Sequence, residues 1–461
     1  MPSLNAASAA ALGRVLHGPV LRPGDAGYDA ARRVWNGRID RRPGLIARCA
    51  GAADVAAAVR FAREGGLELS VRGTGHNVTG RAVTEGGLMI DLSGLAGVRV
   101  DPGRRRVQAQ AGVTWALLDH ETQAFGLATT GGRISTTGVG GLTLGGGYGW
   151  LMRQCGLTVD NVLAVDLVTA DGRAVTADET GDPDLFWALR GGGGNFGIAT
   201  GFEFALHEIG PRVLGGAAFY PAAQAAEVLR TYRDLMAGAP DELAAQCNFL
   251  LAPPAPFVPA HLHGTPIVAI AVCHTGDAER ARHDLARLKG LGEPLVDRIK
   301  PMRYTTLQRL YDVAGRFGSC VHGRSGHLPL LGDGAIEVLA RQAVRLTSPL
   351  SIVMISALGG AVARVGEAAT AFGHRRVAFS YSIDSVWTRP DEERAAIRWA
   401  DDLWTALLPF SEGVYVNELG DEGEERVRAA YLPESYARLA SIKRRYDPDN
   451  VFHLNQNIRP A

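Results

Sequence analysis

The sequence has few cysteines, no excess of charge of either sign and no long apolar run, and these features argue against several classes of protein. Its 461 residues include five cysteines, which are scattered and lack the spacing of a disulfide framework or a metal site. No apolar run reaches the about 18–20 residues of a membrane span, and the first residues lack the basic start of a secretory signal. Acidic and basic residues balance at 48 each, which argues against a nucleic-acid or anionic-membrane partner. We therefore expect a cytoplasmic protein with no metal.

Glycine is abundant, with 58 residues, and its first cluster follows an apolar, strand-like run. The run at 67–71 leads directly into Arg-Gly-Thr-Gly-His-Asn at 72–77, and a second strand-like run follows at 88–92. Glycine allows positive φ and close approach of backbone N–H groups to a ligand, and consecutive N–H groups form anion-binding concavities. Arg72 adds a positive charge. The pattern predicts a phosphate cradle with His76 at its far edge.

Two further glycine tracts occur at 131–149 and 191–197. The first is too rich in glycine for an ordinary helix or strand, and its hydroxyl side chains favour a second wall of a cofactor groove. The second contains G-x-G-x-x-G, the fingerprint of dinucleotide-binding folds. That fingerprint needs a strand before it and a helix after it. Here a helical pattern precedes it and a strand pattern follows, so we reject a Rossmann fold.

The pattern of apolar residues and glycines changes near residue 211. Residues 43–125 alternate between strand and helix patterns, after a helical lead-in over residues 1–36. From residue 212 to 410 the strands are longer, the helices are amphipathic and glycine clusters are few, which favours an antiparallel sheet backed by helices. We therefore predict an α+β protein with a lead-in at 1–36, a first domain at 37–211, a second at 212–410 and a C-terminal segment at 411–461.

Six motifs in this order carry a resemblance to a known family. They are Arg72–Asn77, Gly131–Gly138, Gly146–Gly149, Gly191–Gly197, Tyr415–Asn417, and Tyr446–Phe452 followed by Asn455-Gln456-Asn457. The chain resembles the FAD-linked oxidases related to berberine bridge enzyme, within the vanillyl-alcohol-oxidase superfamily. The resemblance implies a PCMH-type FAD-binding domain, completed by the C-terminal segment. A substrate-binding domain would lie between these parts, with the flavin ring at the junction.

The resemblance also implies the cofactor and its contacts. FAD would be bonded covalently through its 8α-methyl group to His76. Bicovalent members carry a cysteine that aligns with Ile134 here, so a single link is expected. The implied cofactor-binding residues are Arg72, Gly73, Thr74, Gly75, His76, Asn77, Gly131, Thr136, Thr137, Gly140, Gly141, Tyr148, Gly197, Ile198, Asn417, Asn455 and Asn457.

The catalytic base is left open between two residues. Many relatives have a tyrosine as base where this chain has Glu418, in Tyr415-Val416-Asn417-Glu418. Burial would raise the pKa of a glutamate toward neutrality, as a general base needs. Tyr148 matches an active-site tyrosine of the family and is the second candidate, and Tyr415 is a further candidate catalytic residue.

Three functions remain open on the sequence. The favoured one is an oxidase that transfers a hydride from a hydroxylated small molecule to the flavin and reduces O2 to H2O2. The alternatives are a flavin-dependent oxygenase of polyketide tailoring, resembling the enterocin Favorskiiase, and a non-catalytic flavin-bearing protein. We expect a monomer or homodimer. We expect the substrate to be a hydroxylated small molecule, such as a secondary metabolite or a sugar-, alkaloid- or polyketide-like compound, rather than a highly charged one. The candidate substrate contacts are Trp150, Ser356, Tyr381 and Asp384, although alternation alone does not tell which strand face is inward.

Overall fold

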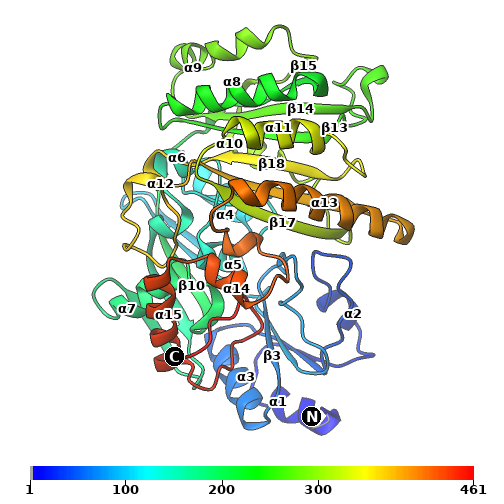
Figure 1. The fold of residues 1–461 in the computed structure, drawn as a ribbon. Helices are drawn as coiled ribbons and strands as arrows, with labels where there is room; N and C mark the ends of the chain where they lie inside the picture. Colours follow the sequence, from blue (N-terminus) through cyan, green and yellow to red (C-terminus); the bar gives the residue numbers. More distant parts are fainter. Residues whose placement is uncertain (1–3) are drawn as a thin grey trace.

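The computed structural model describes residues 4–461 and has two lobes (Figure 1). The first lobe is formed by residues 4–210 together with 411–461, and the second by residues 211–410. Both chain ends lie in the first lobe, and the helix-covered sheet of the second lobe stands above it (Figure 1). Residues 1–3 of the predicted lead-in lie outside the described residues. The mixed helix and sheet content confirms the predicted α+β class.

The first lobe begins with a four-stranded sheet in the order β1-β2-β4-β3. Strands β2 (Leu45–Arg48), β4 (Leu88–Asp91) and β3 (Leu69–Arg72) are parallel, and α3 (Ala52–Glu64) follows β2. The central strand β4 is buried throughout, as expected for a parallel sheet covered on both faces. The lead-in is less helical than predicted. Besides α1 (Ala6–Gly13) and α2 (Tyr28–Ala31), it contains β1 (Val20–Leu21), which pairs with β2.

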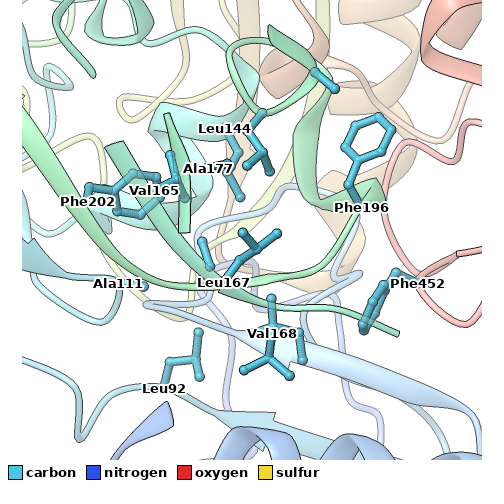
Figure 2. Close-up of a cluster of buried hydrophobic side chains, with 14 of the residues drawn as sticks. Leu92, Ala111, Leu144, Val165, Leu167, Val168, Ala177, Phe196, Phe202 and Phe452 are labelled. Carbon is cyan, nitrogen blue, oxygen red and sulfur yellow. The ribbon is translucent and has the colours of Figure 1, made fainter. Parts of the chain in front are cut away.

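A second, antiparallel sheet of the first lobe has the order β5-β6-β10-β8-β9. Its strands are β5 (Val98–Asp101), β6 (Arg106–Gln110), β8 (Val162–Val168), β9 (Ala174–Asp178) and β10 (Ile198–Ala205). Phe452 of the C-terminal segment lies in the same buried cluster as Val168 and Phe196, so the end of the chain completes this core (Figure 2). Other helices of this lobe include α4 (Trp115–Gln123), α6 (Met152–Cys155) and α7 (Pro183–Leu189).

The glycine-rich tract at 131–149 contains a helix, α5 (Val139–Gly145), which the sequence analysis excluded. A Cβ at Gly140 would lie 3.0 Å from the carbonyl oxygen of Ala111, and one at Gly145 would lie 2.1 Å from Asn417 Oδ1. The helix therefore packs so closely on its neighbours that only glycine fits. Tertiary contacts of this kind override the low helix propensity of glycine.

The second lobe is an eight-stranded antiparallel sheet in the order β15-β12-β14-β13-β18-β19-β17, with β16 also paired to β12. Helices α8 (Ala225–Ala237), α11 (Asp333–Gln342) and α13 (Glu393–Leu407) pack on one face (Figure 1). The opposite face turns toward the first lobe. The strands are β12 (Arg212–Pro221), β13 (Leu243–Leu251), β14 (Pro266–His274), β15 (Val296–Asp297), β16 (Lys300–Arg303), β17 (Cys320–Leu328), β18 (Ile352–Ala357) and β19 (Phe379–Trp387).

The C-terminal segment returns to the first lobe through α14 (Glu424–Ala429) and α15 (Pro433–Tyr446). At the end of α15 the fully buried Lys443 donates to Asp447 Oδ2 at 2.5 Å and to the carbonyl oxygens of Asn195 and Phe452. The Asp447 carboxylate also accepts the N–H groups of Val451 and Phe452. This network fixes the segment against the third glycine tract.

We expect Asp447→Asn to lower the free energy of unfolding by about 3–5 kcal/mol, because it leaves the Lys443 charge buried without its counter-ion. The measurement is urea denaturation followed by tryptophan fluorescence. Asp449→Asn is the matched control: Asp449 is 64% exposed and pairs with Arg63 at the surface, where an ion pair contributes little. Equal losses in the two variants would contradict this account of the network.

Within residues 4–461, no helix is long and apolar enough to cross a membrane. The same residues contain no group of three or more His, Cys, Asp or Glu side chains placed to hold a metal ion. All five cysteines are free thiols.

Candidate active site

A cavity of about 350 Å³ lies where the two lobes meet. Its walls come from the loop after β3, the loop before α5, the inward faces of β18 and β19, and the start of the C-terminal segment. The polar or aromatic lining residues include Thr74, His76, Asn77, Arg133, Thr137, Tyr148, Tyr311, Ser382, Asp384, Tyr415, Asn417 and Glu418. Chain segments more than 300 residues apart therefore form one site.

The predicted cradle lines the cavity from Gly73 to Asn77. Among the described residues, the N–H groups of Thr74, Gly75, His76 and Asn77 donate no hydrogen bond within the chain. Gly75 has a φ of 77°, which helps to turn consecutive N–H groups toward one side. These four free donors can bind an anionic group.

Arg72 lies beside this cradle and pairs with residues outside it. Its Nη1 donates to the buried Asp91 at 3.1 Å, and its Nε donates to the carbonyl oxygen of Arg33. Its Nε also lies 3.4 Å from a Cβ built at Gly75 of the cradle, so the predicted role of the Arg72 charge there stays a prediction.

His76 is enclosed by three segments. Its Nε2 lies 3.0 Å from Thr136 Oγ1, and its ring lies between Trp35 and Phe317, with centroids 5.6 and 5.1 Å away. Burial lowers the pKa of His76 to about 4, although Asp312 acts in the opposite direction. The imidazole is therefore neutral at physiological pH, and a lone pair is available on the ring.

Phe317, one of the residues that enclose His76, belongs to a strap at 308–319, which no sequence motif indicated. Asp312 accepts the N–H and the hydroxyl of Ser135 at 2.8 and 2.7 Å, and the Gly315 carbonyl accepts from the Trp35 indole at 2.8 Å. Tyr311 of the same strap lines the cavity. The strap has an ordinary loop composition, so no local pattern marks it.

An acidic cluster lies on the opposite wall. Arg133 Nη2 donates to Glu418 Oε1 at 3.2 Å, and Nη1 donates to the buried Ser356 hydroxyl at 2.5 Å. Glu418 Oε2 is buried and has no partner among the described residues. Burial raises the pKa of Glu418 to about 7, against the effect of Arg133, and the Asp384 carboxylate raises it further. Burial likewise raises the pKa of Asp384 to about 6.

Two stacked tyrosines form the third wall. The rings of Tyr148 and Tyr415 have centroids 4.1 Å apart. The Tyr148 hydroxyl lies 2.9 Å from Nε2 of the buried His327, and the Tyr415 hydroxyl accepts from the Gly147 N–H and from Asn417 Nδ2. Burial raises the pKa of Tyr148 well above its ordinary value of about 10. The hydroxyl of Tyr148 is therefore suited to donate a hydrogen bond and poorly suited to act as a base.

Three of the four predicted substrate contacts, Tyr381, Trp150 and Ser356, lie outside the cavity lining. Tyr381 faces the helices of the second lobe, where its hydroxyl lies 3.0 Å from Ser411 Oγ. Because side chains alternate along β19, Asp384 faces the cavity and Tyr381 the opposite side. Trp150 lies behind Tyr311, with nearly parallel rings 5.9 Å apart. Ser356 accepts a hydrogen bond from Arg133, which lines the cavity.

Several predicted cofactor contacts also lie outside this lining. Gly131 packs on Trp115 and Gly140 on Ala111, and each is close enough to exclude a Cβ. Their backbone groups can still contact a ligand, so the cofactor roles of these two glycines stay predictions. Gly197 and Ile198 lie at the start of β10, and Asn455 donates to the Gly194 carbonyl. The roles of Gly197, Ile198, Asn455 and Asn457 stay predictions.

The residues present fit FAD. The four free N–H groups match the phosphates, since anions bind such backbone nests. Asn455 Oδ1, Asn457 Oδ1 and Glu418 Oε2 are buried polar atoms with no partner among the described residues, and buried polar groups normally have one. A Cβ at Gly141 would meet no atom within 4 Å. The fold and the cavity define an FAD-dependent oxidoreductase.

Comparisons with known proteins agree with this class. Residues 43–178 match the FAD binding domain family model, and residues 414–459 match the berberine and berberine-like model. The chain is 34% identical over 459 residues to (R)-6-hydroxynicotine oxidase of Paenarthrobacter nicotinovorans, covering 96% of this chain and 97% of that protein. It therefore belongs to the berberine bridge enzyme-like family of FAD-linked oxidoreductases.

Solved structures show the same fold. The crystal structure of 6-hydroxy-D-nicotine oxidase from Arthrobacter nicotinovorans matches with a TM-score of 0.87 and 32% identity, over 97% of this chain and 98% of that one. Xylooligosaccharide oxidase from Myceliophthora thermophila matches with a TM-score of 0.85 and 23% identity, over 99% and 100% of the two chains.

A further relative matches in sequence over part of the chain. An FAD-dependent monooxygenase from Fusarium proliferatum is 36% identical over 198 residues, covering 42% of this chain and 38% of that protein.

Proposed function

We propose that the protein is an oxidase that removes a hydride from a hydroxyl-bearing carbon of a small molecule and produces H2O2. The observation that carries the proposal is Glu418, a carboxylate in the cavity whose Oε2 has no partner in the described chain. Similarity to proteins named as oxidases of 6-hydroxynicotine and xylooligosaccharides supports it. When bound, FAD supplies the hydride acceptor and the means of passing electrons to O2.

The residues of the cavity have different roles in this reaction. Glu418 Oε2 accepts the proton of the substrate hydroxyl, and Arg133 fixes the other oxygen of that carboxylate at 3.2 Å. The buried stack of Tyr148 on Tyr415 provides a rigid wall that positions the substrate and excludes water. Fixed orientation of the reacting groups supplies much of the rate acceleration in such sites.

The covalent link through His76 is part of this proposal. The neutral ring at the cavity wall supports it. Ile134 also lines the cavity, and by the family resemblance it stands at the position that carries a second flavin bond in bicovalent relatives. A single link is therefore expected.

The oxidase is tested by the fate of O2. Substrates are first found by screening for compounds that bleach the bound flavin under anaerobic conditions. Turnover of such a substrate is then measured under 18O-labelled O2. An oxidase gives one H2O2 for each substrate oxidised and leaves the product unlabelled. Label in the product would instead support the oxygenase alternative, which the partial similarity to a monooxygenase favours.

We expect Arg133→Gln to shift the ascending limb of the pH profile of kcat/KM toward alkaline pH by about one unit. Burial sets the pKa of Glu418 to about 7 against the lowering effect of Arg133, so removal of the positive charge raises that pKa. Since the deprotonated carboxylate is the base, activity then appears at higher pH. An unchanged limb would show that Arg133 does not control the titration of Glu418.

A further inference from the structure

The imidazole of His76 is held by residues that either belong to the strap at 308–319 or are attached to it. Thr136 Oγ1 lies 3.0 Å from His76 Nε2. Trp35 stacks on the imidazole, with centroids 5.6 Å apart and 19° between the ring planes. Phe317 of the strap lies nearly perpendicular to the imidazole, at 5.1 Å. The orientation of His76 therefore depends on how the strap is docked.

Asp312 connects the strap to the residue before Thr136. Its Oδ1 accepts the Ser135 N–H at 2.8 Å, and its Oδ2 accepts the Ser135 hydroxyl at 2.7 Å. Arg309 Nε, at 3.4 Å, is the other donor to this carboxylate among the described residues. Hydrogen bonds to an ionised acceptor are stronger than neutral ones, so the buried Ser135 is held firmly. This contact fixes the position from which the Thr136 hydroxyl reaches the imidazole.

Three hydrogen bonds tie the strap to the segment that carries Trp35. The Trp35 indole donates to the Gly315 carbonyl at 2.8 Å. The Gly318 N–H donates to the Trp35 carbonyl at 3.0 Å, and the Gly37 N–H donates to the Ser319 carbonyl at 2.8 Å. The strap belongs to the second lobe and these partners to the first. The second lobe therefore fixes the surroundings of a histidine that the first lobe carries.

Formation of a histidyl link needs an oriented imidazole. A ring nitrogen of His76 would replace one hydrogen of the 8α-methyl group of FAD. That hydrogen and the N–H hydrogen of the imidazole leave with two electrons, which O2 takes up to give H2O2. A misplacement of reacting groups by about 1 Å can cost about 10²-fold in rate. Contacts that orient the ring are therefore expected to control how fast the link forms.

We propose that Asp312 is a positioning residue for the covalent attachment of FAD. Through Ser135 it holds Thr136 against the imidazole, so the link forms at full rate when the strap of the second lobe is docked on the first. The inference rests on the covalent link of the proposed function and goes beyond it, because it assigns the formation of that link to contacts between the lobes.

The charge of Asp312 acts in the same direction. Burial lowers the pKa of His76 to about 4, and the Asp312 carboxylate opposes this effect. A carboxylate that favours a positive ring also favours the charge that develops as the lone pair enters the new bond. Position and charge are separated by the choice of variants.

The test follows attachment of FAD to the full-length apoprotein, produced in a riboflavin-deficient host. The protein is mixed with FAD in air, samples are quenched in acid, and flavin fluorescence in the protein band is measured over time. At saturating FAD, we expect Asp312→Ala to form the link about 10–100-fold more slowly than the wild type, the loss typical of misplaced reacting groups. The FAD concentration that gives half the maximal rate should not change, because the N–H groups that bind phosphates are intact.

Asp312→Asn separates position from charge. Its side-chain oxygen can accept the Ser135 N–H and its amide can donate to the Ser135 hydroxyl, so it should recover most of the rate that Asp312→Ala loses. Val313→Ala is the matched control. It shortens the next side chain of the strap, which is 75% exposed, and should form the link at the wild-type rate.

Two results overturn the positioning role while the covalent link stands. One is an Asp312→Ala rate equal to that of the wild type at saturating FAD, including a loss seen only as weaker binding of FAD. The other is an Asp312→Asn rate as low as that of Asp312→Ala. A wild-type protein that forms no link overturns the inference together with the covalent part of the proposed function. The oxidase reaction is judged separately, by the fate of labelled O2.

Discussion

Replacement of His76 by alanine is expected to abolish covalent attachment of the flavin. The wild-type protein, denatured in acid and run on a gel, should show yellow fluorescence at the position of the protein band. The variant should show none there, because no other lining residue offers a neutral nitrogen in the same surroundings. His76 has a pKa lowered to about 4 by burial, so the unprotonated ring needed for a carbon–nitrogen bond is the form present at neutral pH.

The control is His120→Ala, which removes an exposed histidine from α4 and should leave the fluorescence in place. The His76→Ala protein should still bind FAD non-covalently, because the N–H groups of the cradle remain. Its flavin should therefore be recovered in the soluble fraction after acid precipitation. Fluorescence that stays with the variant protein would show that another residue carries the link, and free flavin from the wild type would refute the link altogether.

The glycine loop could be predicted because its chemistry is local. Positive φ at Gly75 and a run of free N–H groups follow from the residues at 73–77 themselves, and the flanking strands β3 and β4 have the expected bounds within two residues. Helix α4, within the predicted strand–helix alternation of residues 43–125, begins after Thr114, whose hydroxyl accepts the Leu117 N–H. Such features depend on residues that are close together in the sequence, so the sequence alone indicates them.

The rest of the site depends on partners that are distant in the sequence. Arg72 pairs with Asp91 because β3 and β4 place them side by side. Arg133 meets Glu418 across 285 residues, and no local pattern indicates that contact. The alternation of side chains along β19 places Tyr381 and Asp384 on opposite faces of the strand. It does not tell which face is inward, because that depends on where the helices pack.

Replacement of Glu418 by glutamine is expected to slow anaerobic reduction of the flavin by about 10²–10⁴-fold, the contribution typical of a general base. Glutamine keeps the shape, and its side-chain oxygen can still accept from Arg133 Nη2, but the amide accepts no proton at neutral pH. The wild-type rate should rise with pH through about 7, where the Glu418 carboxyl ionises. That ascending limb should be absent from the variant. Stopped-flow measurement of flavin bleaching, with the substrate found in the screen, gives both results.

Glu425→Gln is the matched control, since Glu425 is exposed on α14 of the same segment, and its reduction rate should equal that of the wild type. A Glu418→Gln enzyme that keeps both its rate and the ascending limb would remove Glu418 from the chemistry. Tyr148 would then be the remaining candidate base, although burial raises its pKa and makes its deprotonated form scarce near neutral pH. In that case Tyr148→Phe should show the rate loss assigned here to Glu418, and the pH limb should lie far above 7.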